Sequence, residues 1–435
     1  MNSKFSKFQL ITLSVFVIFI IVGVGAFAFY KGGSNSSTLP AITIWGTIPK
    51  LKFDQYVSTI SNNSSMQINV TYVEKTQAQF TLDFISALAR GQGPDVILVP
   101  IELVLPNEDK LALIPYSSMS QYAFKQIYVQ EADVYLNSKG IFGFPFLLDP
   151  LVMYWNRDMF DAAGIATYPR LWDDFSKLNK SLTSKDSNGN LRKSAVALGQ
   201  FGNINNAREI LGTLLMQAGN PVTAQDATGL VSSKINMANS SGVEAVVRFF
   251  SQFVDPASPN FSWNKSMPNS KSAFLSGVLA TYFGFASELA DIRSKNPNLN
   301  FDVALMPSPK SGGTGVTYGR MYGFSLVKTS PNLAADFQII TLLSSAQFLG
   351  DFSKSLYLPN VRRDVLVTGS DDPYISLFNN AALVSSTWLD ADPNKSNQIF
   401  SDMIGAFTSG QKSINQAVQD AGGQYDAILK QAVVQ

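Results

Sequence analysis

The stretch Gly91-Gln92-Gly93-Pro94-Asp95-Val96-Ile97-Leu98-Val99 decides how the first part of the chain folds. The residues after Asp95 form a continuous apolar run of strand length, which is typical of a strand buried on both faces of a sheet. The glycines before Pro94 mark the end of a preceding helix. The stretch therefore predicts a helix that leads directly into a buried strand.

The sequence on either side of this stretch alternates between strand and helix patterns. Residues 41–45 and 68–73 have strand character, whereas residues 53–60 and 80–88 repeat apolar side chains at helical spacing. This β-α-β-α-β order predicts an α/β fold with a parallel sheet covered by helices. A second alternation of strand and helix patterns starts near Gly140 and continues through residues 151–155. An Asn-Gly turn is expected at 188–189 between two short strands. Further helices are expected at 206–217, 243–253, 333–348, 398–409 and 414–431.

Composition excludes several classes of protein. The chain has 435 residues, enough for two domains, and a formal net charge of +1, which excludes a strongly basic nucleic-acid binder. It contains no cysteine, so disulfides, thiol nucleophiles, Cys-ligated zinc and a lipid attached to cysteine are excluded. It contains no histidine, so there is no Ser-His-Asp triad and no His-ligated metal. We expect neither a metal nor a cofactor.

The N-terminal region, residues 1–37, is expected to lie outside the fold. An uncharged apolar run from Phe8 to Tyr30 exceeds the roughly 20 residues that a helix needs to span a bilayer. Lys4 and Lys7 precede it, which favours a cytoplasmic N-terminus and an exported body. Two alternatives remain: an uncleaved anchor, favoured by the length of the run, or a signal peptide cleaved after Ala28. Without Lys4, Lys7 and Lys31, the body carries 30 basic and 32 acidic residues, a formal charge of −2.

Several motifs of the body occur in the order of a known family. They are Ile42-Thr43-Ile44-Trp45-Gly46, then Gly91 to Val96, then Gly140 to Pro145 with Asp149 and Met153 to Phe160, then Ala163-Gly164-Ile165 and Pro169 to Phe175. The chain resembles the extracellular solute-binding proteins of bacterial ATP-binding-cassette (ABC) importers, of the large sugar-binding type that includes maltodextrin-binding proteins. The chain departs from the family at Leu171, where a helix-starting threonine is common, at Val278, which replaces a lysine, and at Gly284-Phe285, where sugar binders often have Gly-Pro-Trp. It also lacks the cysteine to which the lipid of Gram-positive relatives is attached.

The resemblance implies two α/β lobes, each a mostly parallel sheet flanked by helices, with the ligand in the cleft between them. Lobe 1 would comprise residues 41–147 with about 320–350, and lobe 2 residues 150–315 with about 355–435. The implied function is capture of a small solute, a sugar or oligosaccharide, by lobe closure, and its delivery to a membrane permease. The protein would be a monomer on the cell surface and would not be an enzyme. The alternatives are a carboxylate-dependent glycosidase and a membrane-tethered sensor or adhesion module.

Candidate ligand residues follow from positions within these motifs. Aromatic rings pack on sugar faces, and carboxylates and amides hydrogen-bond to sugar hydroxyls. The candidates are Trp45, Thr47, Lys50, Glu102, Asp149, Asn205, Asn206, Phe285, Tyr322 and Trp388. Asp149 is the strongest polar candidate, because a carboxylate between Leu148 and Pro150 needs a partner or a ligand to offset desolvation. The alternatives are core packing for the aromatic residues, surface or loop positions for Thr47, Lys50 and Glu102, helix capping for the asparagines, and a hinge hydrogen bond for Asp149.

Overall fold

The computed structural model describes residues 39–64, 68–226, 229–235, 241–309, 315–367 and 369–434. The expected membrane-spanning run and its cleavage site, residues 8–30, lie outside the described residues. Within the described ranges, no single helix has the length and apolar character needed to cross a bilayer. Helices α11 (Leu333–Leu343) and α12 (Ala346–Ser355) meet that requirement only as a pair, and they are bent by 62°.

The first lobe is built on the predicted β-α-β-α-β unit. Strand β1 (Ile42–Gly46) lies between β2 (Val70–Glu74) and β3 (Val96–Pro100) and is parallel to both. Helices α2 (Lys50–Asn63) and α3 (Phe80–Ala89) connect these strands. Every residue of β3 is buried, as its apolar run predicts. The predicted order and the parallel pairing are confirmed.

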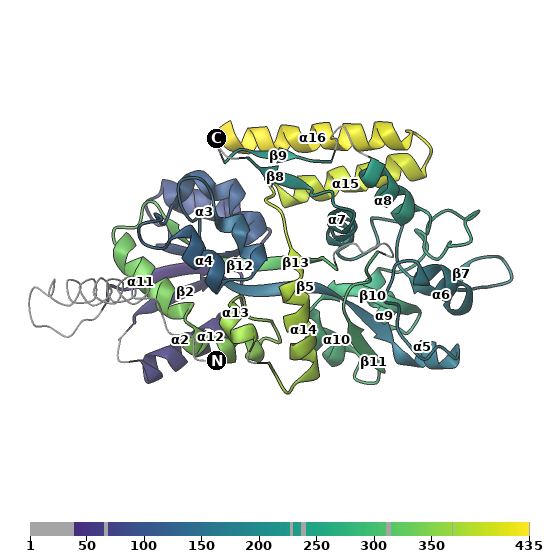
Figure 1. The fold of residues 1–435 in the computed structure, drawn as a ribbon, viewed down its shortest axis with the longest axis horizontal. Coiled ribbons are helices and arrows are strands. Elements are labelled where there is room, and N and C mark those ends of the chain that lie inside the picture. Colours follow the sequence, from purple (N-terminus) through teal and green to yellow (C-terminus); the bar gives the residue numbers. More distant parts are fainter. Residues whose placement is uncertain are drawn as a thin grey trace, which may run out of the picture.

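Two long strands join the lobes. Strands β5 (Phe144–Asn156) and β12 (Thr317–Val327) are antiparallel and pair from Phe144 with Phe324 to Pro150 with Gly319. Strand β12 also pairs with β3, and the remainder of β5 pairs with β10 (Leu279–Phe285) and β11 (Phe301–Ala304). The result is one sheet of eleven strands, in which β5 runs from one lobe into the other (Figure 1).

The second lobe extends this sheet. Strand β10 is parallel to β7 (Leu191–Val196), and β7 forms a hairpin with β6 (Ser184–Lys185) around the predicted Asn-Gly turn. Helices α5 to α10 lie on the right in Figure 1, and α15 and α16 pack side by side above them. The helices after α3, apart from α11 and α12, have these bounds: α4 (Gln121–Ile127), α5 (Arg157–Ala162), α6 (Asp174–Leu182), α7 (Ala207–Gln217), α8 (Ser241–Ser251), α9 (Ser270–Leu275), α10 (Glu288–Lys295), α13 (Arg363–Leu366), α14 (Pro373–Leu383), α15 (Pro393–Thr408) and α16 (Ile414–Val434). The shorter elements are β4 (Leu111–Ala112), β8 (Thr223–Gln225), β9 (Val231–Ser233), β13 (Ser385–Ser386) and the 3₁₀ helices η1 (Ile101–Leu103), η2 (Leu105–Lys110) and η3 (Gln130–Tyr135).

One predicted helix is wrong in its extent. The apolar spacing of 333–348 predicts one helix, but the structure has α11 and α12 with a break at Ser344 and Ser345. Ser345 has extended backbone angles, and the carbonyl of Leu343 accepts a hydrogen bond from the Tyr56 hydroxyl. The end of α11 is thus satisfied by a tertiary contact, which apolar spacing does not reveal.

Residues 361–363, which the predicted boundary near 355 assigns to the second lobe, contact residues 128 and 129 of the first. The backbone N–H of Val129 donates to the carbonyl of Val361 at 2.9 Å, and Arg363 Nε donates to the carbonyl of Tyr128 at 2.6 Å. Both contacts tie 361–363 to the first lobe. We propose that α12 and α13 belong to the first lobe and that the final part of the second lobe begins after Leu366.

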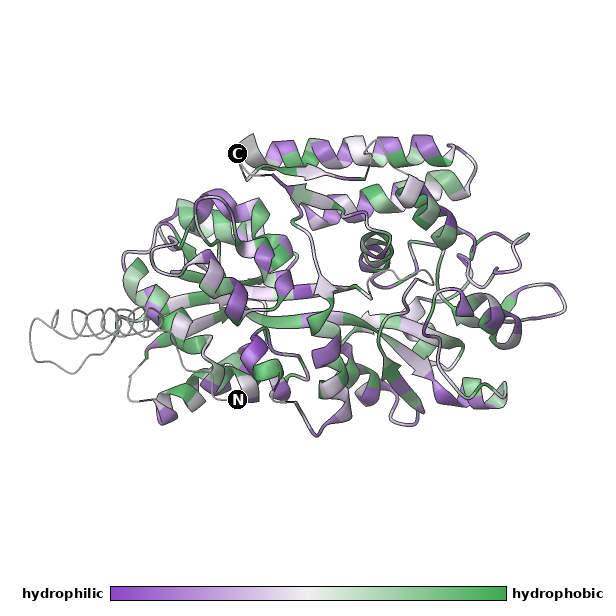
Figure 2. Cartoon of the chain, viewed as in Figure 1, coloured by the Kyte–Doolittle hydropathy of each residue, from purple (hydrophilic) through white to green (hydrophobic). Residues whose placement is uncertain are grey.

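The core follows the sheet. Figure 2 shows hydrophobic residues along β5, whereas hydrophobic and hydrophilic residues alternate along α16. In the first lobe, Phe53 stacks on Tyr72 at 4.3 Å between ring centroids, and Phe146 packs against Phe324 at 4.7 Å. Aromatic burial of this kind is a major part of core energetics, and it fixes β5 and β12 against the helices.

Candidate ligand site between the lobes

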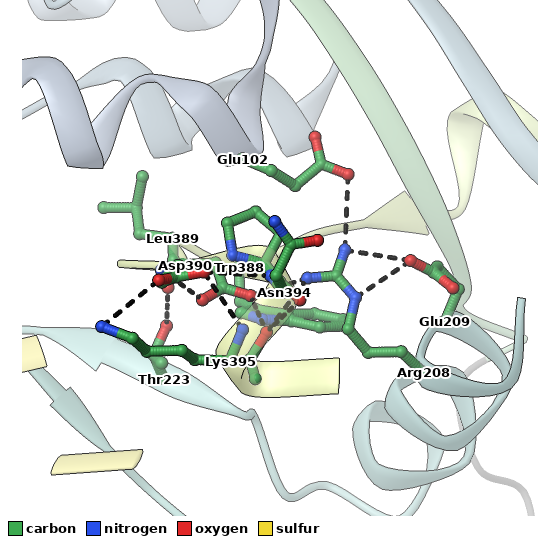
Figure 3. A network of polar contacts seen from close by, with 12 residues as sticks. Glu102, Arg208, Glu209, Thr223, Trp388, Leu389, Asp390, Asn394 and Lys395 are labelled. Carbon is green, nitrogen blue, oxygen red and sulfur yellow. Dashed lines mark hydrogen bonds and ion pairs between the residues drawn. The ribbon is translucent and has the colours of Figure 1, made fainter. Parts of the chain in front are cut away.

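A largely buried group of charged and polar residues lies where the two lobes meet, and Figure 3 shows Glu102, Arg208, Glu209 and Asp390 from it. We call the group the Arg208 cluster and define it by its members: Glu102, Arg208, Glu209, Tyr318, Arg320 and Asp390. Its members come from η1 of the first lobe, from α7 of the second lobe, from the crossover strand β12 and from the segment before α15.

Arg208 is the centre of the cluster. It lies in the first turn of α7, and its side chain is 5% exposed. Nη1 donates to Asp390 Oδ2 at 2.6 Å, and Nε and Nη2 lie 3.0 and 2.9 Å from Glu209 Oε1. Burial lowers the pKa of an arginine, but Glu209 and the other acids outweigh that effect and raise the pKa of Arg208 well above its usual value. The guanidinium is therefore a permanent buried charge that needs these partners.

Glu102 enters the cluster from the first lobe. Its Oε1 accepts hydrogen bonds from the Tyr318 hydroxyl at 2.7 Å and Arg320 Nε at 3.2 Å, and it lies 3.5 Å from Arg208 Nη2. Its other oxygen, Oε2, has no hydrogen-bond partner among the described residues. Burial raises the pKa of Glu102, but Arg320 and Arg208 outweigh burial and hold that pKa below its usual range. Glu102 is therefore ionised near neutral pH.

Aromatic rings cover both guanidinium groups. Arg320 lies over the ring of Phe285 at 4.1 Å, and Arg208 lies over Trp388 at 5.4 Å. Both distances are within the range of a cation–π interaction. Trp388 also meets Tyr318 edge-on at 4.9 Å and donates from Nε1 to the Tyr425 hydroxyl at 3.0 Å. Gly212 of α7 makes room for the indole, because a Cβ there would lie 2.5 Å from two ring carbons.

Asp149 lies beside the cluster and is bound to Ser287. It is buried in β5, and its carboxylate accepts hydrogen bonds from the Ser287 backbone N–H at 2.9 Å and hydroxyl at 2.6 Å. Burial raises the pKa of Asp149 to about 6, although Ser287 opposes the shift. Asp149 therefore anchors the crossover strand to the residue before α10; its predicted contact with a ligand stays a prediction.

The two asparagines are bound within the second lobe. Asn205 Oδ1 accepts from the Lys271 backbone N–H at 3.0 Å, at the start of α9. Asn206 has a left-handed backbone, with φ of 58°, and its Nδ2 donates to Glu288 Oε1 at 3.1 Å and to the carbonyl of Phe283 at 3.3 Å. Asn205 thereby binds the start of α9, and Asn206 binds β10 and α10.

The remaining predicted residues lie on the first lobe and on β12. Trp45 is half-buried with Lys75 Nζ 4.2 Å above its ring, and the backbone N–H of Thr47 donates to Leu98. Lys50 binds Asp54 and the carbonyl of Tyr72. Tyr322 lies two residues beyond Arg320 on β12, so both side chains project from the same face of the strand.

The structure thus brings together some of the predicted residues. Glu102, Phe285 and Trp388 contact the arginines directly, and Asp149 and Tyr322 lie next to Arg320 in the sheet. Trp45, Lys50, Asn205 and Asn206 contact other partners, and the buried Thr47 hydroxyl has no hydrogen-bond partner among the described residues. Our sequence reasoning missed Arg208 and Arg320. For Arg320 a signal was present: it is the one charged residue in the mainly apolar strand β12, whereas Arg208 stands beside Glu209 in the first turn of α7, where charged residues are common.

Two features outside the Arg208 cluster do not contain the predicted ligand residues or a metal site. A cavity of about 1200 Å³ lies within the second lobe, between α8, α15, α16 and residues 199–201, and no predicted ligand residue lines it. In the described part of the chain, no group of three or more acidic side chains is arranged to hold a metal ion. The Arg208 cluster is the stronger candidate because it joins both lobes. Arg320 contacts Glu102, just past the carboxyl end of β3, and Phe285, at the carboxyl end of β10, and ligands bind at such strand ends in open α/β sheets.

Solved structures share this fold. The cyclic α-maltosyl-1,6-maltose binding protein from Arthrobacter globiformis has a TM-score of 0.71 at 17% identity, over 90% of this chain and 100% of its own. The GacH receptor of Streptomyces glaucescens has a TM-score of 0.68 at 18% identity, over 90% and 98%. A cyclo/maltodextrin-binding protein complexed with maltotetraose has a TM-score of 0.70 at 16% identity, over 93% and 99%. At these identities the likeness shows the fold, two α/β lobes with a shared sheet.

The family of the chain is shown by its sequence. A comparison with curated proteins gives no match. Residues 65–348, more than half of the chain, match the family described as bacterial extracellular solute-binding protein. The chain belongs to the family of bacterial extracellular solute-binding proteins.

Proposed function

We propose that this protein captures a saccharide outside the cytoplasm, between its two lobes, and delivers it to the permease of an ABC importer. The observation that carries the proposal is the Arg208 cluster, in which residues of both lobes and of a crossover strand meet at the carboxyl ends of β3 and β10. Membership of the family and the saccharide ligands named for the solved structures of the same fold support it.

The arrangement suits a binding protein that works by closing. Glu102 and Arg208 belong to different lobes, so their contact changes when the lobes move apart. The strands β5 and β12 pass between the lobes, and their pairing is irregular between Tyr322 and Gly323, which gives a place for bending. A ligand that contacts both lobes favours the closed arrangement, and the permease then recognises that arrangement.

Binding without turnover is the function that the carboxylates support. A glycosidase needs two carboxyl groups free to face a scissile bond across about 5–9.5 Å. Here Glu102, Glu209 and Asp390 are each held by an arginine. We therefore propose no catalytic residues.

Attachment to the membrane is a proposal from sequence. The run from Phe8 to Tyr30, with Lys4 and Lys7 ahead of it, supports an N-terminal anchor that holds the body outside the cell. The mass of the protein recovered from membranes tests this: an anchored chain retains residues 1–28, whereas a cleaved one begins at Phe29.

The binding proposal is tested by titrating the full-length chain with a panel of mono- and oligosaccharides, followed by calorimetry and thermal unfolding. We expect one class of saccharide to bind and to raise the unfolding temperature, and Trp388→Ala to weaken binding at least tenfold. Trp263→Phe is the matched control, because Trp263 is buried in the second lobe and hydrogen-bonded to Asn203. Absence of any saccharide response would contradict the proposal. Delivery is tested separately, by stimulation of a reconstituted importer's ATPase activity with the loaded protein.

A further inference from the structure

We infer that the outer face of helix α3 docks on the surface of an anionic lipid bilayer and so gives the body a second contact with the membrane. The inference rests on the proposed function, in particular on the proposed N-terminal anchor, and it names the surface of the body that faces the lipid. It follows from the apolar outer face of α3, from the point at which the chain enters the first lobe, and from an arginine at the end of the helix.

The first observation is that α3 is apolar on two opposite sides. Phe80, Phe84 and Ala87 face the core and are buried. On the outer side, Leu82 and Ile85 are 67% and 42% exposed, and their spacing of three residues places them on one helical face. The solvent side of a surface helix normally carries polar or charged residues, and a helix that is apolar all round is normally covered. We therefore expect the outer face of α3 to have a partner.

The second observation is where the chain enters the first lobe. Helix α3 connects β2 to β3, and β1 lies between these strands, so α3 crosses over β1. Leu39 packs against the core just ahead of β1. The start of β1 lies beside Asp95, because the backbone N–H of Thr43 donates to Asp95 Oδ2 at 2.8 Å, and Asp95 follows soon after the end of α3. The chain therefore enters close to the C-terminal end of α3.

The length of chain ahead of β1 allows α3 to reach the bilayer. Residues 31–38 separate the apolar run from Leu39, and they cover at most about 30 Å even when fully extended. The outer face of a helix packed on a sheet lies roughly 15 Å from the strands, and a helix of the length of α3 is about 15 Å long. The connection is therefore long enough for α3 to touch the bilayer. It is also short enough to hold α3 at an effective concentration on the order of millimolar, so a weak contact is sufficient.

The third observation is a positive charge at the same end of the helix. The Arg90 guanidinium donates to Ser86 Oγ at 2.7 Å and to Gln92 Oε1 at 3.4 Å, and it has no carboxylate partner among the described residues. The one acidic residue of α3, Asp83, is paired with Lys75 at 2.8 Å. The outer side of α3 thus combines apolar side chains with a cation that no acid neutralises, which is the chemistry that binds an anionic lipid surface.

Docking through α3 decides which lobe moves. The anchor and α3 both hold the first lobe, so the first lobe stays at the membrane by two contacts. Closure then brings the second lobe toward the first.

The test uses the absence of cysteine from the chain, which allows one fluorophore to be attached at a chosen position. The full-length protein is reconstituted in vesicles of phosphatidylcholine and phosphatidylglycerol that contain a lipid with a spin-labelled head group, which quenches nearby fluorophores. Ala89→Cys places the fluorophore on α3, and Ser409→Cys places it at the end of α15 as the matched control, since both residues are exposed. We expect at least twofold quenching at residue 89, little at residue 409, and a loss of quenching as salt is raised.

Further variants separate docking from mere proximity to the bilayer. Leu82→Gln combined with Ile85→Gln should remove at least half of the quenching at residue 89. Arg90→Gln should reduce the quenching in vesicles that contain phosphatidylglycerol and not in vesicles of phosphatidylcholine alone. Leu51→Gln is the matched control, because Leu51 is 70% exposed on α2, which lies on the other side of the first-lobe strands from α3 (Figure 1). Circular dichroism and unfolding temperature check that each variant folds.

The outcomes distinguish docking from the proposed anchor and from solute binding. Release of the protein from the vesicles by alkaline carbonate overturns the anchor, and docking with it. A retained protein whose label at residue 89 is not quenched, or is quenched equally after Leu82→Gln and Ile85→Gln, overturns docking through α3 and leaves the anchor in place. Shielding of the label that rises with protein density shows a second copy on α3 and overturns the bilayer as its partner. Saccharide titration tests the proposed binding function independently of all these results.

Discussion

Glu102 and Arg320 form a partly buried ion pair, 3.2 Å from Oε1 to Nε, between the first lobe and the strand that both lobes share. Glu102 is 1% exposed in its side chain, and Arg320 is 21% exposed. The pair is therefore largely shielded from water. Loss of the pair would change both the free energy of unfolding and the distance between the lobes.

The first prediction concerns this pair. Removing one member of a buried ion pair leaves the other charge uncompensated, at a cost of about 3–5 kcal/mol. We expect Glu102→Ala to lower the free energy of unfolding by an amount in that range and to increase the radius of gyration in small-angle scattering. Asp109→Asn is the control: it removes an ion pair with Lys110 in which the aspartate is 48% exposed, and exposed pairs contribute less than about 1 kcal/mol. Equal effects of the two variants would contradict the prediction.

The second prediction concerns pH and Glu131. Burial, to which the nearby Glu102 adds, raises the pKa of Glu131 from 4.5 to about 8, although Ser385 lowers it. Between these values the folded protein holds a proton that the unfolded chain has released. Stability conferred by that proton is complete below pH 4.5 and is lost as pH rises toward 8, by at most about 1.4 kcal/mol per unit.

Unfolding measured from pH 5 to 8 tests this. Glu131→Gln should flatten the decline in stability, because its amide has no proton to lose. Asp133→Asn, in the same 3₁₀ helix but 38% exposed beside Lys125, should leave the decline as it is. Burial raises the pKa of Asp149 to about 6, so this residue adds to the decline in stability at the acidic end of the range. Asp149→Asn measures the part of the decline that Asp149 causes. An unchanged slope in Glu131→Gln would refute this assignment.

The third prediction concerns the packing of Trp388 on α7. A Cβ at Gly212 would lie 2.5 Å from two carbons of the indole ring, so Gly212→Ala forces Trp388 or α7 to move. We expect a loss of about 1–3 kcal/mol and a change in tryptophan fluorescence. Gly405→Ala in α15 is the matched control, since a Cβ there meets nothing within 4 Å. It should be neutral or stabilising by up to about 1 kcal/mol, the helix preference for alanine. Similar losses at the two positions would show that packing on Trp388 is not the cause.

The fourth prediction concerns the left-handed backbone of Asn206. With φ of 58°, this position tolerates asparagine and glycine better than other residues. Asn206→Ala loses both that tolerance and the hydrogen bonds to Glu288 and Phe283, and we expect it to cost about 2–3 kcal/mol in urea unfolding. Asn206→Gly loses only the hydrogen bonds and should cost about 1 kcal/mol less. If glycine is no better than alanine, backbone conformation does not set the requirement here.

The fold was largely predictable because its signals are local. The apolar run after Asp95 became the fully buried strand β3, and the Asn-Gly turn became the hairpin of β6 and β7. The break between α11 and α12 was not predictable, because it depends on Tyr56, far away in sequence. Likewise, the return of residues 361–363 to the first lobe depends on contacts with Tyr128 and Val129 that no local pattern encodes.

The arrangement of the candidate site was predictable only in part. Glu102, Phe285 and Trp388 were predicted from motif positions, and the structure places all three against the arginines; their contact with a ligand stays a prediction. Asn205 and Asn206 occupy the expected loop, yet they hold α9 and β10 in place. A motif gives the position of a residue in the chain, whereas its partner depends on which segments the fold brings together.

The sequence by itself determined the first strands of the sheet, several of the helices, the absence of cysteine and histidine chemistry, and the family that the chain resembles. These follow from periodicity, composition and motif order, which are properties of neighbouring residues. Only the tertiary structure decided that Glu102, Arg208 and Arg320 meet. They are separated by more than a hundred residues at each step, and each charge is tolerated in the interior only because folding places the opposite charge beside it.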